Sequence, residues 1–221
     1  EYRENAAADK LKTLINQYNI LECKKVVPFA SFIYFSNELN KFMNEEINKP
    51  HLFHESLKSK IDSIILAPGE EQNISDLVQK KESLDFWKNK YNAINNLPLD
   101  TYDKSVDFDI LQSEYMKYKN KILEINSKFL IYLSSKIKFL KFFQKINIFL
   151  LDHKKYYEFS LIDGFKVTKN TNSDISMHSE SLLFIFKNDF GYDTLTVNGC
   201  FNASKEGFIK TTRSFAIGSL N

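Results

Sequence analysis

The stretch Lys145–Lys169, KINIFLLDHKKYYEFSLIDGFKVTK, predicts a small antiparallel sheet. KINIFLLD and YYEFSLID are both rich in β-branched and aromatic residues, and a short connection, His153-Lys154-Lys155, separates them. Two such runs joined by a few residues are typical of a β-hairpin. The segment GFKVTK then predicts a third strand. Strands of this kind need helices to cover them, so helices are expected in the flanking sequence.

The sequence after this sheet predicts a compact mixture of helices and strands. SESLLFIFKND is expected to be a short helix with Ser179 as its N-terminal cap, because a serine hydroxyl can accept from a free backbone N–H there. DTLTVNGCF is expected to be a strand that ends at a glycine turn, and KEGFIKTTRSFAIGSL a terminal helix. Residues 145–221 are therefore expected to form a compact α+β module.

The middle of the chain, residues 76–144, is expected to be a helical connector because Pro98 is its only proline and it contains no glycine. ESLDFWKNKYNAI and SVDFDILQSEYMKYKNKILEI carry their apolar residues on one stripe. SKFLIYLSSKIKFLKFF continues with a wide aromatic face and interleaved lysines. We expect this last helix to face the core and to leave its lysines in solvent. A helix that lies on a membrane surface is the alternative.

Residues 1–75 alternate between helical and strand-like sequence, which is an α/β pattern. An amphipathic helix is expected over Arg3–Tyr18 and a second helix over Pro50–Ile61, where the proline suits the first helical position. Buried strands are expected over Cys23–Phe35 and Ser63–Leu66. Since proline cannot donate to a sheet ladder, Pro28 is expected at a strand start or edge.

Composition excludes several classes of protein. The 221 residues are 43% hydrophobic and 26% charged, which is ordinary for a globular protein. A net charge of +2 gives no electrostatic case for nucleic-acid binding. Without an apolar run near 18 residues we expect no membrane span. Two widely spaced cysteines, Cys23 and Cys200, predict reduced thiols in a cytoplasmic protein.

The sequence contains no recognisable catalytic motif. His51 and His54 in HLFHE share a helix face but lack the H-E-x-x-H pattern, so a surface histidine pair is favoured over a metal site. The paired carboxylates in PGEE follow a strand-like run, which makes Glu70 a weak site candidate. There is no G-x-S-x-G elbow and no glycine-rich phosphate loop.

Two separated segments carry a resemblance to one family. VVPFASFIYFSNELNKFMNEEIN and the following IILAPGEE resemble motifs near the end of the catalytic domain in one branch of metallo-β-lactamase-fold hydrolases. That branch is similar to ascorbate-phosphate lactonase and to the CMP-sialic acid hydroxylase. SESLLFIFKNDFGYDTLTVNGCF resembles the terminal module of the same proteins, which is similar to a sterol-carrier fold.

The resemblance implies a domain organisation. Residues 1–75 would be the C-terminal part of a metallo-β-lactamase-like domain, followed by the connector and a sterol-carrier-like module over residues 145–221. The family's His-x-His-x-Asp-His metal motif is absent from this sequence and would lie upstream of it. The resemblance therefore implies no cofactor in this chain and a divalent metal (zinc, manganese or iron) in a preceding half.

The resemblance also implies a site and a role. The chain would supply a cleft wall and an accessory module to a metal-dependent hydrolase-like protein that acts on a small-molecule substrate. The residues expected to line the cleft and bind substrate are Ser31, Tyr34, Asn37, Asn40 and Glu70. The alternative is a non-catalytic module that binds an apolar ligand or a protein partner, including a second copy of the chain.

Two departures from the family pattern bear on catalysis. Asn37 stands where many members have histidine, and an amide cannot act as a general base. Cys200 stands where arginine is usual, which removes a fixed cation. For Asn37 an ordinary capping role in a strand-to-helix turn is an equally good interpretation.

Overall fold

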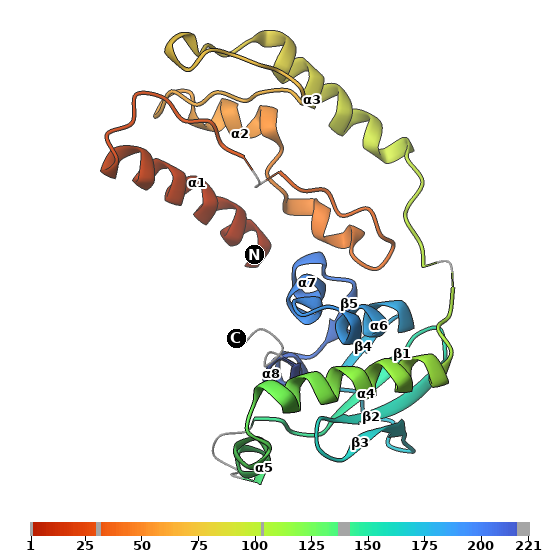
Figure 1. Ribbon diagram of the computed structural model, residues 1–221. Coiled ribbons are helices and arrows are strands. Elements are labelled where there is room, and N and C mark those ends of the chain that lie inside the picture. The colour runs from red at the N-terminus through yellow and green to blue at the C-terminus, as the bar shows by residue number, and fades with distance from the viewer. Residues whose placement is uncertain (1, 30–31, 103, 137–141, 216–221) are drawn as a thin grey trace. The chain divides into compact units, whose positions relative to one another are not determined.

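The computed structural model of the protein describes residues 2–29, 32–102, 104–136 and 142–215 (Figure 1). The chain divides into two compact units, unit 1 over residues 1–100 and unit 2 over residues 101–221. Unit 1 is helical with extended connections, and unit 2 combines helices with a five-stranded sheet. The fold class is therefore α+β, as predicted.

Unit 1 has three α-helices among its described residues. They are α1 (Tyr2–Ile20), α2 (Pro50–Leu57) and α3 (Lys81–Ala93), with short 3-10 helices at Lys41–Glu46, Ile74–Asp76 and Ile94–Asn96. Phe53, Leu57 and Ile61 form a buried cluster, on which the apolar stripe of α1 packs. The predicted stripe is thus confirmed, with Leu11, Leu14, Ile15 and Tyr18 as its members.

The two strands predicted in unit 1 are wrong. Among the described residues of Cys23–Phe35 and Ser63–Leu66, pairing is limited to isolated bridges, and neither segment belongs to the sheet. Ile64 and Ile65 are nevertheless buried, so the apolar content that suggested a strand is used for packing. The α/β alternation therefore describes the order of helical and extended segments without a sheet between them.

Pro28 explains why pairing in unit 1 stops after one bridge. Val26 N–H donates to the carbonyl of Asp62 at 3.0 Å, and Ile64 N–H donates to the carbonyl of Val26 at 2.9 Å. These two bonds make a parallel bridge between Val26 and Ser63. The next donor of a parallel ladder would be the N–H of residue 28, which proline lacks. The edge position predicted for Pro28 is consistent with this bridge.

Unit 2 contains the sheet and five α-helices among its described residues. The elements are α4 (Phe108–Ile125), α5 (Lys128–Lys136), β1 (Ile146–Leu150), β2 (Lys155–Ser160), β3 (Gly164–Val167), β4 (Ile175–Met177), α6 (Ser179–Lys187), α7 (Gly191–Asn198), β5 (Phe201–Ala203) and α8 (Lys205–Phe215). The strand order is β3-β2-β1-β4-β5. The predicted hairpin and third strand are confirmed, since β1, β2 and β3 pair in antiparallel succession.

Strand β4 joins the sheet in a different direction. It pairs in parallel with β1, with Ile148 opposite Ile175, and β5 then pairs antiparallel with β4. Alternate residues of β1 are buried, namely Ile146, Ile148 and Leu150, so one face of the sheet points into the core. Strand β4 was not predicted, because its three residues are too few to show a pattern.

Aromatic rings from three helices cover the buried face of the sheet. The ring of Phe159 on β2 lies 5.8 Å from that of Tyr115 on α4 and 4.5 Å from that of Phe215 on α8. The ring of Phe186 on α6 lies 6.0 Å from that of Phe159 and completes this aromatic layer. Helix α8 approaches the start of β4 closely, because a Cβ on Gly207 would lie 2.1 Å from the carbonyl oxygen of Asp174.

Two local predictions in unit 2 need correction. The segment DTLTVNGCF, residues 193–201, was expected to be a strand, but its first six residues belong to helix α7, which ends at Gly199 in the left-handed conformation (φ 68°). The alternating Thr-Leu-Thr-Val pattern is overridden because Tyr192 and Leu195, three apart, are both buried. The cap of α6 is His178, whose side chain accepts from Glu180 N–H, and Ser179 is the first helical residue.

The expectation that α5 faces the core is wrong. Ile131 is buried, but Phe129, Leu130 and Leu133 are exposed. Residues 137–141, which complete the aromatic segment, lie outside the described residues. Helix α5 therefore lies on the surface of unit 2. The alternative prediction for this segment, a helix that lies on a membrane surface, stays a prediction.

The structure divides the chain once, between Asp100 and Thr101. Helix α4 lies within the predicted connector of residues 76–144, yet it packs on α6 and β3 and so belongs to unit 2. The predicted boundaries after residues 75 and 144 describe family domains and stay a prediction.

Candidate functional site

The asparagines predicted to line a cleft form a self-contained turn. The N–H of Asn37 donates to the side-chain oxygen of Asn40 at 3.0 Å, and the N–H of Leu39 donates to that of Asn37 at 2.9 Å. Asn40 is buried. The amides therefore stabilise the backbone ahead of the 3-10 helix Lys41–Glu46. The N-cap of that helix is Asn40, so Asn37 belongs to the turn before the helix and does not occupy the cap position.

Asn44 closes this turn from its far end. Its side chain accepts from Phe35 N–H at 2.8 Å and donates to the Phe35 carbonyl at 2.7 Å. Tyr34, the neighbouring candidate, is half-buried. Ser31 lies outside the described residues. Thus the structure brings Asn37 and Asn40 together, in a role that serves the fold.

Glu70 is held in a separate network. Its carboxylate accepts from Ser83 Oγ at 2.5 Å, Ala67 N–H at 3.0 Å and Gln72 Nε2 at 2.6 Å, and Lys80 Nζ lies 3.2 Å away. The side chain is 11% exposed. The Ser83 hydrogen bond is the main cause that lowers the pKa of Glu70 to about 2, so the carboxylate is charged at neutral pH.

The neighbouring chain is fixed by two amide clamps. Gln79 accepts from Ile65 N–H at 2.7 Å and donates to the Ile65 carbonyl at 3.1 Å. Gln72 makes the same pair of bonds with Val78, both at 3.0 Å. Each amide pairs with a backbone as a neighbouring strand would, so Glu70 sits in a loop that is rigidly tied to its surroundings.

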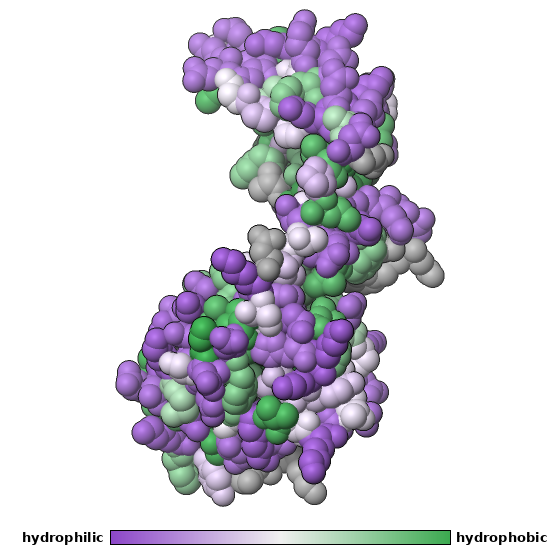
Figure 2. All heavy atoms as spheres, turned by 90° about the vertical axis from the view of Figure 1, so that its right-hand side faces the viewer, coloured by the Kyte–Doolittle hydropathy of each residue, from purple (hydrophilic) through white to green (hydrophobic). Residues whose placement is uncertain are grey.

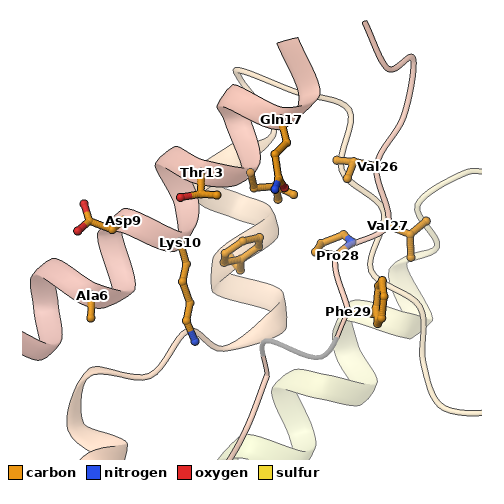
Figure 3. A pocket seen from close by; sticks show the side chains of 11 residues that line it. Ala6, Asp9, Lys10, Thr13, Gln17, Val26, Val27, Pro28 and Phe29 are labelled. Atoms are coloured by element: carbon orange, nitrogen blue, oxygen red, sulfur yellow. The ribbon is translucent and has the colours of Figure 1, made fainter. Parts of the chain in front are cut away.

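A groove of about 480 Å³ opens between α1 and the Val26–Phe29 segment (Figure 3). Figure 3 shows Thr13 and Gln17 of α1 along one side and Val27, Pro28 and Phe29 along the other. Leu14 and Phe53 add apolar lining, while Asp9 and Lys10 add charge. The groove thus combines an apolar wall with a polar rim, as ligand sites commonly do.

The segment that forms one wall of the groove, Val26–Phe29, directly precedes the predicted site residues in the sequence. This wall ends at Phe29, and Phe29 is highly exposed, at 81%. A smaller hollow of about 170 Å³ shares Ala6 and Lys10 with the groove and is lined by Ile33 and Phe35. Extended chain on both sides of the candidate residues therefore lines hollows beside α1. Sequence reasoning missed α1 as a contributor, although Lys10 and Thr13 lie off its apolar stripe.

The histidine pair His51 and His54 has separate environments. His54 Nδ1 hydrogen-bonds Ser63 Oγ at 3.1 Å, whereas the ring of His51 lies 6.2 Å from that of Tyr91. Burial, helped by Lys49 and Lys88, lowers the pKa of His51. Within the described residues, no group of three or more His, Cys, Asp or Glu side chains could hold a metal ion.

Unit 2 contains a polar cluster that the sequence did not reveal. The Asp152 carboxylate accepts from Ser179 N–H at 3.0 Å and from the hydroxyls of Ser179 and Ser105 at 2.5 and 2.7 Å. The Nε2 atoms of His153 and His178 each lie 3.7 Å from it. Burial opposes the negative charge, but the Ser179 and Ser105 hydrogen bonds outweigh it and lower the pKa of Asp152.

The geometry of this cluster suits a structural role. His153 Nε2 donates to the Val106 carbonyl at 2.7 Å, and its Nδ1 accepts from Tyr157 at 2.6 Å. Both serine hydroxyls donate to Asp152 instead of to a histidine, so neither is activated as a nucleophile. The cluster ties the segment before α4 to the β1–β2 turn and to the start of α6.

Comparison with models of protein families, with curated proteins and with solved structures gives no match for this chain. In the part of the chain that the structure describes, no helix is both long and apolar enough to cross a membrane. The groove and the sequence resemblance are therefore the two features that bear on function.

Proposed function

We propose that unit 1 forms one wall of a ligand-binding cleft in a metallo-β-lactamase-fold, metal-dependent hydrolase-like protein. In this role the chain contributes binding, and the divalent metal and the water that it activates belong to a preceding part of the protein. Unit 2 is the accessory module of that protein. The substrate is a small molecule.

The groove beside α1 is the observation that supports this proposal. It has the size of a small-molecule site, an apolar wall at Val26–Phe29 and a polar rim on α1. The segment that resembles the hydrolases, Val26–Asn48, starts in this wall. Asn37, Asn40 and Glu70 fix nearby backbone and are not among the residues that line the groove, so Ser31 and Tyr34 remain the candidates for direct contact with substrate.

Occupancy of the groove is testable with the dye 1-anilinonaphthalene-8-sulfonate, which has apolar rings and an anionic group. We expect Thr13→Phe to weaken dye binding several-fold, because the new ring occupies the groove that Thr13 lines. Lys12→Phe is the matched control, since Lys12 is an exposed neighbour on α1 outside the groove lining. The fluorescence of the dye is excited directly, without energy transfer from the protein. Equal dye affinities of Thr13→Phe and Lys12→Phe would contradict a binding groove.

Metal content tests the hydrolase class. Elemental analysis of the product of the complete reading frame is expected to find stoichiometric zinc, manganese or iron. A metal-free product in which Thr13→Phe still weakens dye binding supports the second candidate instead, a non-catalytic module. That candidate binds an apolar ligand or a protein partner, and the exposed Phe29 at the groove favours it.

A further inference from the structure

Helix α5 of unit 2 presents its apolar side chains to the outside of the unit. Phe129 is 69% exposed, Leu130 60%, Tyr132 51% and Leu133 42%. Ile131 is 3% exposed and anchors the helix to the unit. A nine-residue helix that buries one large apolar residue and exposes four others is unusual for a surface facing only water.

The charge of the same segment has one sign. Within α5, Lys128–Lys136, the charged residues are Lys128 and Lys136, both basic, whereas the acidic Glu124 belongs to the end of α4. Lys128 is exposed beside Phe129. Exposed rings and leucines accompanied by lysine, without acidic residues, are typical of helices that lie in the interface of an anionic bilayer. There the apolar side chains enter the headgroup boundary and the ammonium groups stay among lipid phosphates and carboxylates.

We propose that α5 docks unit 2 on the surface of a membrane that contains anionic lipids. The helix lies along the surface with Phe129, Leu130 and Leu133 inserted, and Lys128 contacts the acidic headgroups. This contact is peripheral and differs from a membrane span. It is also independent of the groove in unit 1 and therefore of the function proposed for that groove.

Other apolar patches of unit 2 fit this proposal less well. Phe190 and Val197 are also exposed, at 59% and 71%. However, Asp189 next to Phe190 pairs with Lys121, and Asp193 lies three residues further on, so the charge around Phe190 is mixed and includes carboxylates that anionic headgroups repel. Single-sign basic charge distinguishes α5, and it also makes Phe190 and Val197 a suitable control surface.

Co-sedimentation with vesicles tests the proposal. The 221-residue chain is expected to bind vesicles of phosphatidylcholine with 30% phosphatidylserine and to bind pure phosphatidylcholine more weakly. The double variant Phe129→Ser/Leu130→Ser is expected to weaken binding to the anionic vesicles at least tenfold, because it removes two inserted apolar side chains. Phe190→Ser/Val197→Ser removes a similar exposed area and is expected to bind as the parent chain does.

Salt dependence and sedimentation separate membrane docking from other uses of this surface. Raising the salt concentration is expected to weaken vesicle binding, since the lysine contribution is screened. Absence of binding to the anionic vesicles, or equal loss in both double variants, contradicts the proposal. So does a self-associating chain, seen by analytical ultracentrifugation, that becomes monomeric in Phe129→Ser/Leu130→Ser without any vesicle binding.

Discussion

At the scale of single residues, polar side chains that suggested a site are used to fix backbone. Asn37 and Asn40 close a turn, and the Glu70 carboxylate gathers donors from Ser83, Ala67 and Gln72. The sequence could indicate that these residues are site candidates, because amides and carboxylates that follow apolar runs need hydrogen-bond partners. It could not indicate that their partners are local N–H and O–H groups, since that depends on the path of the folded chain.

Glu70 allows a test through pH. Its pKa falls from 4.5 to about 2 on folding, so the folded state favours the charged form. The resulting stabilisation is fully present above pH 4.5 and disappears as pH falls towards 2. We expect Glu70→Gln to lower the free energy of unfolding by about 2 kcal/mol at pH 7, measured by urea unfolding.

The pH dependence of this loss gives the control. The difference between parent and Glu70→Gln is expected to be constant from pH 7 to pH 5 and to shrink below pH 4.5. Glu71→Gln, at the exposed neighbouring position, is expected to leave stability nearly unchanged. A Glu70→Gln effect as small as that of Glu71→Gln would show that the network contributes little.

At the scale of elements, helices were predicted better than strands. The stripes of α1 and α4 are long and periodic, and each packs as the stripe indicates. The expected strand at Cys23–Phe35 failed because strand content reflects packing against partners, and Pro28 ends the single bridge available. The strand expected over residues 193–201 failed at 193–198, because tertiary burial of Tyr192 and Leu195 outweighs β propensity.

The two amide clamps make a matched pair for a second test of unit 1. The side-chain amide of Gln79 hydrogen-bonds the backbone of Ile65, which is 2% exposed. That of Gln72 hydrogen-bonds the backbone of Val78, which is 54% exposed. We expect Gln79→Ala to cost about 2 kcal/mol of unfolding free energy, because water cannot replace the lost partners of a buried backbone. Gln72→Ala also removes a partner of Glu70, yet it is expected to cost less. Equal costs in urea unfolding, or the reverse order, contradict this explanation.

At the scale of the whole molecule, the two units differ in the size of their cores. Among the described residues, five hydrophobic side chains are buried in unit 1 and twenty-two in unit 2. Since buried apolar area supplies most of the stability of a fold, unit 1 is expected to unfold first. The sequence suggested several regions but not this inequality, because the strand-like residues of unit 1 were expected to build a sheet.

Trp87, the single tryptophan, reports on unit 1 alone. Its indole N–H donates to the Leu66 carbonyl at 2.9 Å, so unfolding of unit 1 changes its surroundings. We expect tryptophan fluorescence in a urea titration to change at a lower concentration than the main loss of far-ultraviolet circular dichroism. Coincident transitions would show that the chain unfolds as one cooperative body.

The parallel pairing of β4 with β1 implies an order of assembly during folding. The meander β1–β2–β3 needs only contacts between neighbours in the chain, so it closes early. Strand β4 joins later because β2 and β3 lie between it and its partner β1 in the chain. Helix α8 must follow, since Gly207 fits against Asp174 only once β4 is in place. We therefore expect Phe215 of α8 to pack onto the aromatic core last. Until it does, the rings of Phe159 and Tyr118 stay exposed to solvent, and the partly folded chain can aggregate through them.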